Sequence, residues 1–324
     1  MLSKLYRVKY LHSLLEFFWG TLEARYLHSQ YVKSAGSIQK GLENVLIRWG
    51  DKLNNYSSHV AEGHCPIFIF SAGWRSGSTL VQRLVFSSGK YFIWGEPYGG
   101  AGIIEHLAEQ FAAFSQIWPV EKNFLSSFFR EKKNLNNICY EWIANLTPDI
   151  QYFVQSHRKF LETLFYDPIK EYFTQWGLKE VRLGYEHALY LYFLYPRARF
   201  VFLVRNPIEA YRSYKRFRRW YVQMPFKPVF TPFSFAKHWN KLANDFLLAK
   251  EKIGAFLLKY EDLVYQPDKV FSGLQNYLAI NMKRDLLTKK VGSSNPNRIK
   301  LNFLEVVVIK YICRQSASKI GYNL

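Results

Sequence analysis

Short apolar runs recur along the chain from residue 66 onward, each bounded by glycine, proline or charged residues. Runs of this length predict buried strands. The four expected strands are residues 67–70 (IFIF), 91–94 (YFIW), 199–204 (RFVFLV) and 255–263 (AFLLKYEDL). Between them the pattern predicts helices, including residues 78–89 and a helix that begins at Pro207, which suits a first-turn position. Strands that alternate with helices favour an α/β domain, a three-layer sandwich with a central parallel sheet between crossover helices.

The first sixty residues have a different pattern. Leu and aromatic residues recur at mixed three- and four-residue spacing, which predicts a helical extension that closes at Pro66. We therefore divide the chain into an N-terminal helical extension, residues 1–62, and one larger α/β domain, residues 63–324. Within that domain, residues 100–175 are also helical in pattern and rich in aromatic side chains.

The opening stretch does not look like a secretion signal, because Lys9, His12 and Glu16 interrupt its apolar residues. No run of about 18 apolar residues, the length needed to span a membrane, occurs in the sequence. The opening stretch could instead be an amphipathic helix, which either packs on the domain or rests on a membrane with its basic edge. Both alternatives stay open, with packing on the domain favoured.

Composition adds a strong charge bias. Lys and Arg number 44 against 25 Asp and Glu, a formal net charge of +19. This excess favours anionic partners, among them nucleotides, acidic glycans, nucleic acid and membrane surfaces, without choosing between them. Cys65, Cys139 and Cys313 lie far apart, so we expect neither a disulfide framework nor a metal site. A reducing, cytoplasmic location is the prediction that follows.

The segment GWRSGSTL, residues 73–80, joins the first expected strand to the next helix. A glycine-rich bend in that place directs backbone N–H groups at one spot, where the helix N-terminus adds partial positive charge. A nucleotide-triphosphate loop would carry Lys before its last Ser or Thr, but here Gly77 is followed by Ser78 and the one cation is Arg75. The loop therefore predicts a site for a phosphate-like anion without magnesium; the alternative is a plain Gly/Ser turn.

A second candidate anion site comes later in the chain. Arg205 ends the strand at residues 199–204, and Ser213 follows two turns into the next helix. Both side chains can face one crevice at the carboxyl edge of a parallel sheet. Arg205 alone could equally be a structural salt-bridge partner. Together with the first loop, it suggests a ligand that has phosphates at two ends.

Four segments carry a resemblance to a known family. They are FSAGWRSGSTLVQRL, GEPYG, LYPRARFVFLVRNPIEAYRSY and LLKYEDLVYQP. In this order they resemble the sulfotransferase superfamily, which uses 3′-phosphoadenosine 5′-phosphosulfate (PAPS) as donor and does without a metal. The resemblance covers roughly residues 66–324, including the closing KVGSSNP and IGY. It implies an enzyme that transfers a sulfuryl group to a hydroxyl of an acceptor.

The resemblance also implies roles for individual residues. Arg205 and Ser213 match the site of the 3′-phosphate, and Tyr260 of KYEDL takes the place of an aromatic residue near the adenine. The 5′-phosphosulfate site corresponds to Arg75, Ser76, Gly77, Ser78 and Thr79. The loop that closes over the nucleotide corresponds to Ser293 or Ser294 with Arg298.

Sulfuryl transfer to an alcohol needs a base for the hydroxyl proton and cations over the moving group. Glu96, in GEP at the end of residues 91–94, resembles the catalytic carboxylate of one branch of the superfamily; alternatively, it caps a helix that begins near Gly99. Lys179 in WGLKEV is the candidate for stabilising the transition state, a role that Arg75 shares. The alternative for Lys179 is a solvated surface lysine.

Two other functions remain as alternatives. A kinase-like enzyme would need a metal and a loop lysine, and the sequence has no such lysine. A non-catalytic binder of glycans or nucleic acid would use the basic, aromatic stretch at residues 211–228. There Tyr211, Tyr214 and Phe217 recur every third residue, which favours a packed helix with a basic outer face that guides an anionic acceptor. We expect no specific nucleic-acid partner. The acceptor can be a carbohydrate, a lipid, a small-metabolite alcohol or a protein tyrosine, with the first three favoured.

Overall fold

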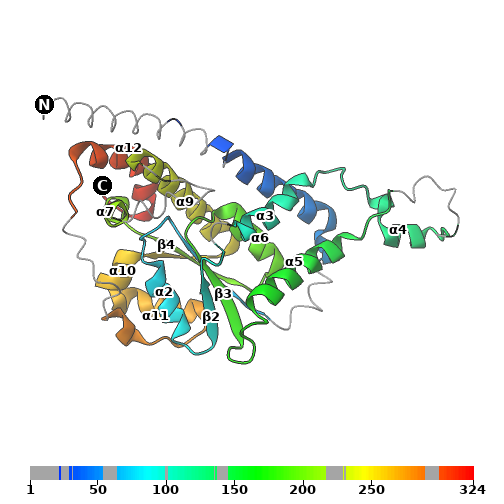
Figure 1. Ribbon diagram of the computed structural model, residues 1–324, viewed down its shortest axis with the longest axis horizontal. Coiled ribbons are helices and arrows are strands. Elements are labelled where there is room, and N and C mark those ends of the chain that lie inside the picture. Colours follow the sequence, from blue (N-terminus) through cyan, green and yellow to red (C-terminus); the bar gives the residue numbers. More distant parts are fainter. Residues whose placement is uncertain are drawn as a thin grey trace, which may run out of the picture.

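The computed structural model of the protein describes residues 22, 29–30, 32–53, 64–98, 101–134, 136, 145–216, 229, 231–288 and 299–324. Within this part of the chain, five parallel strands form one sheet in the order β2-β3-β1-β4-β5, with helices on both faces (Figure 1). The predicted α/β fold with a central parallel sheet is confirmed. The strands are β1 (Ile67–Ser71), β2 (Tyr91–Gly95), β3 (Gln175–Glu180), β4 (Arg199–Val204) and β5 (Phe256–Lys259).

The described helices follow the strands closely along the chain, as crossover connections require. The α-helices are α2 (Ser78–Phe86), α3 (Ile103–Glu109), α4 (Leu125–Arg130), α5 (Ile150–Phe165), α6 (Tyr185–Leu194), α7 (Pro207–Lys215), α9 (Pro232–Ile253), α10 (Tyr260–Tyr265), α11 (Pro267–Leu278) and α12 (Phe303–Ile320). Three short 3₁₀ helices are η1 (Gln110–Ala113), η2 (Glu121–Asn123) and η4 (Arg284–Leu287).

The central strand β1 is buried from end to end. Its side chains alternate between faces, so that Phe68 and Phe70 enter the larger core cluster, whereas Ile67 and Ile69 enter a smaller cluster under α2 and α11. Both faces are therefore covered by helices, which explains why this strand is an unbroken apolar run rather than an alternating one.

Residues 32–53 form a helix whose apolar side chains join the larger core. Ile38, Leu42, Val45 and Trp49 are at most 1% exposed, and their four- and three-residue spacing places them on one helix face. This part of the predicted extension therefore packs on the α/β domain. Residues 1–21, on which the prediction of membrane contact falls, lie outside the described residues. No described helix has the length and apolar character needed to cross a bilayer.

The structure differs from the predicted strands at two places. Strand β3, at Gln175–Glu180, was not among them, although it lies next to β1 in the sheet. The strand expected over residues 255–263 ends at Lys259, because helix α10 begins at Tyr260. Glu261 and Asp262 lie in the first turn of α10, where acidic side chains stabilise the helix dipole. As a result, Tyr260 lies at the carboxyl end of β5.

The sheet order fixes where a ligand can bind. Strands β2 and β3 lie on one side of β1, and β4 and β5 lie on the other. The connections therefore diverge at the carboxyl end of β1, which is where open α/β sheets form their ligand crevices. The loop after β1 contains the candidate anion site of the sequence, so the fold places that loop at this point of divergence.

Candidate active site

The loop between β1 and α2 is held in its bend by internal hydrogen bonds. Gly73, Arg75 and Gly77 have φ angles of 85°, 66° and 94°, in the left-handed region that glycine adopts readily and arginine does not. The buried Ser76 hydroxyl donates to the Gly73 carbonyl at 3.0 Å, so this side chain fixes the loop. No side chain caps the first turn of α2, which leaves its N-terminus available to an anion.

Arg205 and Ser213 lie against this loop. Arg205 Nη1 donates to the carbonyl of Arg75 at 2.9 Å, and Arg75 Nε donates to Ser213 Oγ at 3.2 Å. The guanidinium carbon of Arg205 lies 4.6 Å from the centre of the Tyr260 ring. Residues from the loop after β1, from β4 and α7, and from the end of β5 thus meet at one place. We call Arg75, Arg205, Ser213 and Tyr260 the β4 end of the site.

Two features of the β4 end point to a ligand. The Nε of Arg205 is buried and has no hydrogen-bond partner among the described residues. At Gly77 a Cβ atom would come within 2.2 Å of the Tyr260 ring, so the ring covers the backbone at the start of α2. The buried donor of Arg205, in need of an acceptor, fits an anionic ligand, and Gly77 allows the Tyr260 ring to lie close beside it.

Glu96 and Lys179 lie on the other side of β1. Gly95 pairs with Lys179 in the β2–β3 ladder, and the Glu96 N–H donates to the Lys179 carbonyl at 2.8 Å. Their side chains form an ion pair, with Lys179 only 7% and Glu96 25% exposed. Glu96 has a φ of 52°, a strained conformation of a kind that clusters at active sites. We call Glu96 and Lys179 the β2 end of the site.

The geometry of the β2 end excludes two of the alternatives left by the sequence. Helix α3 begins at Ile103 after Gly102 as N-cap, so Glu96 does not cap a helix near Gly99. The burial of Lys179 means that it is not a solvated surface lysine. Because β1 separates β3 from β4, the loop after β1 lies between the β2 end and the β4 end along the carboxyl edge.

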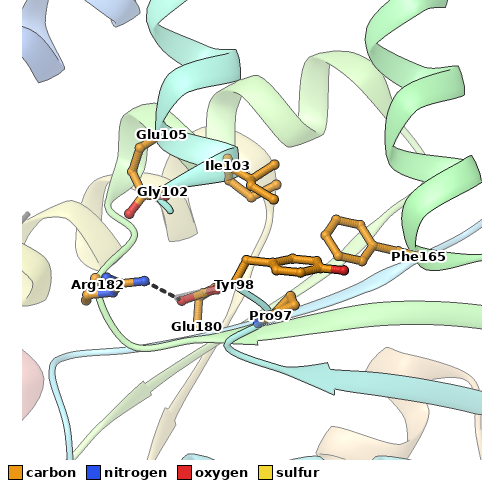
Figure 2. Close-up of a pocket in the computed structure, with 9 residues that line it drawn as sticks. Pro97, Tyr98, Gly102, Ile103, Glu105, Phe165, Glu180 and Arg182 are labelled. Atoms are coloured by element: carbon orange, nitrogen blue, oxygen red, sulfur yellow. Dashed lines mark ion pairs between the residues drawn. The ribbon is translucent and has the colours of Figure 1, made fainter. Parts of the chain in front are cut away.

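A pocket beside the β2 end contains residues that the sequence analysis did not select. It holds about 230 Å³ of empty space, part of which is open to solvent. Tyr98, Ile103 and Phe165 line its apolar side, and Glu105, Glu180 and Arg182 line its polar side (Figure 2). Strand β3 was not predicted, so Glu180 and Arg182 were not placed at the carboxyl edge of the sheet. Recognition of residues 175–180 as a strand would have placed them there.

Glu180 has an unusual environment in this pocket. Burial raises the pKa of Glu180 to about 8, Arg182 opposes the rise, and the nearby Glu105 and Glu96 reinforce it. The Arg182 guanidinium lies 3.8 Å from the Glu180 carboxylate, and both side chains are at most 6% exposed. A carboxyl that keeps its proton near neutral pH can both donate and accept a hydrogen bond.

Other predicted residues contribute differently or fall outside the described chain. Ser78 is buried and Thr79 is exposed, both in the first turn of α2. Tyr211 and Tyr214 are buried on one face of α7, as their spacing predicts. Ser293, Ser294, Arg298 and residues 217–228 lie outside the described residues. Among the described residues, no group of three His, Cys, Asp or Glu side chains could hold a metal ion.

Comparison with known proteins gives one family. A family model described as "Sulfotransferase family" matches residues 66–284, more than half of the chain. These residues include both ends of the candidate site and the pocket beside it. Comparison with curated proteins gives no significant match.

Several solved structures resemble the chain at low identity. The "Sulfotransferase Domain from the Curacin Biosynthetic Pathway" is 18% identical, with 81% of this chain and 99% of that chain covered and a TM-score of 0.45. Sulfotransferase STF9 from Mycobacterium avium is 12% identical, with 90% and 86% covered and a TM-score of 0.45. Mouse sulfotransferase SULT7A1, solved with PAP, is 11% identical, with 82% and 71% covered and a TM-score of 0.32.

Proposed function

The chain belongs to the sulfotransferase family, and we propose that the carboxyl edge of its sheet is the active site. The protein is an enzyme that moves a sulfuryl group from PAPS to a hydroxyl of an acceptor. The observation that carries our assignment of the site is the meeting of the β1 loop, Arg205, Ser213 and Tyr260, because Arg205 and Arg75 are linked directly across the sheet edge.

The β4 end would hold the nucleotide part of the donor. Arg205 and Ser213 would bind the 3′-phosphate, and Tyr260 would lie against the adenine. The buried Nε of Arg205 supports this role, because a phosphate oxygen would supply the acceptor that it lacks among the described residues. The Tyr260 ring packs directly on the backbone of Gly77, so the adenosine would lie beside this ring and not between the ring and the loop.

The β1 loop would hold the 5′-phosphosulfate. Ser76, with its hydroxyl turned into the loop, would contribute its backbone N–H. Ser78 and Thr79, in the first turn of α2, would add N–H and hydroxyl donors together with the positive end of the helix dipole. Arg75, which contacts Ser213, would place its positive charge beside the 5′-phosphate. The bound donor supplies an activated sulfuryl group on a phosphate leaving group.

The β2 end would carry the proton and charge changes of the reaction. Glu96 would accept the proton of the acceptor hydroxyl as general base. Lys179, already in contact with Glu96, would orient this carboxylate and bring a positive charge to the developing charge of the transfer. When the carboxylate gains a proton, the Lys179 charge is released from its partner and becomes available to the leaving phosphate.

The remaining assignments are predictions of the same kind. Ser293 would close over the nucleotide, residues 100–175 and 220–235 would line much of the acceptor site, and the basic residues of the stretch 211–228 would guide an anionic acceptor. Independence from a metal is likewise a proposal. A cytoplasmic location and membrane contact through the N-terminus stay predictions.

A donor comparison tests the proposed function. The purified protein is incubated with PAPS labelled in the sulfuryl group and a panel of hydroxyl acceptors, with EDTA present and absent. We expect label transfer from PAPS in both conditions and none from ATP labelled in its γ-phosphate. Tight binding of ATP but not PAPS by calorimetry, or transfer that stops with EDTA, would contradict the proposal.

A further inference from the structure

The pocket beside the β2 end has two chemically different sides. Tyr98 and Phe165 present aromatic rings on one side, and Figure 2 shows the Tyr98 ring directed towards Phe165. On the other side, Glu105 from α3 extends towards Glu180 and Arg182 from the end of β3. Phe165 is 2% exposed and Tyr98 is 62% exposed, so the closed part of the pocket lies at Phe165 and its mouth at Tyr98.

Glu180 is the residue in this pocket that calls for an explanation. Its side chain is buried, yet the described part of the chain offers no hydrogen-bond partner to its Oε2 atom. The Arg182 guanidinium lies 3.8 Å from that atom, too far for a hydrogen bond. A buried carboxyl oxygen left in this state is costly, and native structures rarely keep one without a function.

The pocket adjoins the β2 end through the loop that follows β2. Pro97 and Tyr98, which line the pocket, follow Glu96 directly in the loop after β2, whereas Lys179 and Glu180 are consecutive in β3, so their side chains leave the strand on opposite faces. The charge of Glu96 is close enough to raise the pKa of Glu180, after the larger effect of burial. An acceptor whose reacting hydroxyl is at Glu96 would reach the mouth of this pocket along Pro97 and Tyr98.

We propose that the pocket binds a second hydroxyl of the acceptor, through Glu180, so that the enzyme sulfates polyols in preference to isolated alcohols. The inference rests on the proposed function, because it takes Glu96 as the residue that faces the reacting hydroxyl. A hydroxyl both donates and accepts, which suits a carboxyl that keeps its proton near neutral pH. The enclosed part of the pocket has a volume of only about 10 Å³, roughly that of one water-sized group, so it takes a single hydroxyl of the acceptor.

The proposal makes Glu180 a specificity-determining residue. A site built to hydrogen-bond a hydroxyl rejects an analogue without it, because the buried polar group is then left unpaired. The positive charge of Arg182 partly offsets the cost of leaving the Glu180 carboxyl unpaired. We therefore expect a moderate preference for the acceptor with the second hydroxyl, about 10- to 100-fold in affinity. The carbon skeleton would gain from contact with Tyr98 at the mouth whether or not the second hydroxyl is present.

A binding experiment with matched probes tests the inference without relying on turnover. The probes are trans-cyclohexane-1,2-diol and cyclohexanol, titrated by calorimetry or saturation-transfer NMR into the full-length protein saturated with 3′-phosphoadenosine 5′-phosphate (PAP). We expect the diol to bind about 10- to 100-fold more tightly than cyclohexanol. In Glu180→Leu the two probes should bind alike, while Glu171→Leu, at an exposed carboxylate, should keep the difference.

PAP affinity separates this inference from the proposed function. If PAP does not bind to the wild type, the proposed donor site is wrong; if PAP binds but the two probes bind equally or not at all, the inference is wrong. Retention of the preference in Glu180→Leu would also overturn it. Glu180→Gln, which keeps the size of the side chain, covers the case in which the leucine variant does not fold, and it should reduce the preference while PAP binding is retained.

Discussion

The two ends of the proposed active site differ in what their basic side chains contact. At the β4 end, Arg205 contacts neutral partners, the Arg75 carbonyl and the Tyr260 ring. At the β2 end, Lys179 is paired with the carboxylate of Glu96. A guanidinium whose described contacts are neutral suits a permanent anion such as a phosphate, whereas an ion pair suits a place where charge changes during a reaction. The difference predicts that the β4 end controls donor binding and the β2 end controls turnover.

The largest effect should come from Glu96→Gln. The amide cannot accept the hydroxyl proton, so we expect kcat to fall about 10²–10⁴-fold, the usual contribution of a general base. The PAP affinity, measured by calorimetry, should stay within about twofold, since the β4 end is unchanged.

The comparison of the two ends fails if this variant keeps near-normal turnover, or if its loss lies in donor affinity. Glu209→Gln on α7 is a suitable control, because it removes a carboxylate that pairs with Arg212 near the β4 end. We expect its kcat to be that of the wild type.

Lys179→Met should have the next largest effect. Loss of one positive group at the transferring centre lowers kcat by about 10²–10³-fold. Lys170→Met, which removes an exposed lysine paired with Asp167, should leave kcat unchanged. Because Lys179 and Glu96 act as a unit, the double variant should lose much less than the product of the two single losses. Fully multiplicative losses in steady-state assays would argue that the two residues act independently.

Arg205 of the β4 end and the neighbouring Gly77 could be predicted from the sequence because each follows a clear local pattern. Arg205 ends an unbroken apolar strand and Gly77 lies in a glycine-rich bend, so their places in an α/β sheet follow from the pattern alone. Their contact with Tyr260 depends on the tertiary structure and does not follow from local patterns. If the strand had extended over residues 255–263 as expected, Tyr260 would lie within the sheet. It lies at the carboxyl edge of the sheet because α10 begins there.

The β2 end and its pocket were harder to predict because β3 breaks the strand pattern. Residues 175–180 contain Gly177 and end in two charged residues, which an isolated sequence presents as a polar turn. The structure needs this glycine, since a Cβ would lie 2.1 Å from the Ile67 carbonyl oxygen. Lys179 and Glu180 are charged and nevertheless buried, and the proposed site gives this burial a reason. Local rules fail most often at functional positions of this kind.

Arg205→Ala sharpens the comparison at the β4 end. Removing this guanidinium leaves a charged group of the nucleotide without its partner, so PAP should bind about 10- to 100-fold more weakly. Saturating PAPS should restore much of kcat, because Glu96 and Lys179 are intact. Arg199→Ala is the matched control: Arg199 begins the same strand at its opposite end, where it lies over the Tyr277 ring, and its loss should not change PAP affinity. Unchanged affinity in Arg205→Ala, measured by calorimetry, would remove this residue from the donor site.

Gly77→Ala should have the smallest effect, and it tests the contact between the loop and Tyr260. A side chain at a φ of 94° costs about 1–3 kcal/mol of stability wherever it occurs. Gly89→Ala isolates that cost, since Gly89 has a φ of 71° and nothing within 4 Å of its would-be Cβ. Both variants should therefore melt earlier, whereas PAP affinity should fall only in Gly77→Ala. There the new methyl pushes the Tyr260 ring from its place, and loss of one aromatic contact costs about 0.5–1.5 kcal/mol, or about 2- to 12-fold in affinity. An equal change in PAP affinity in both variants would mean that strain in the backbone, and not the position of Tyr260, determines donor binding at this loop.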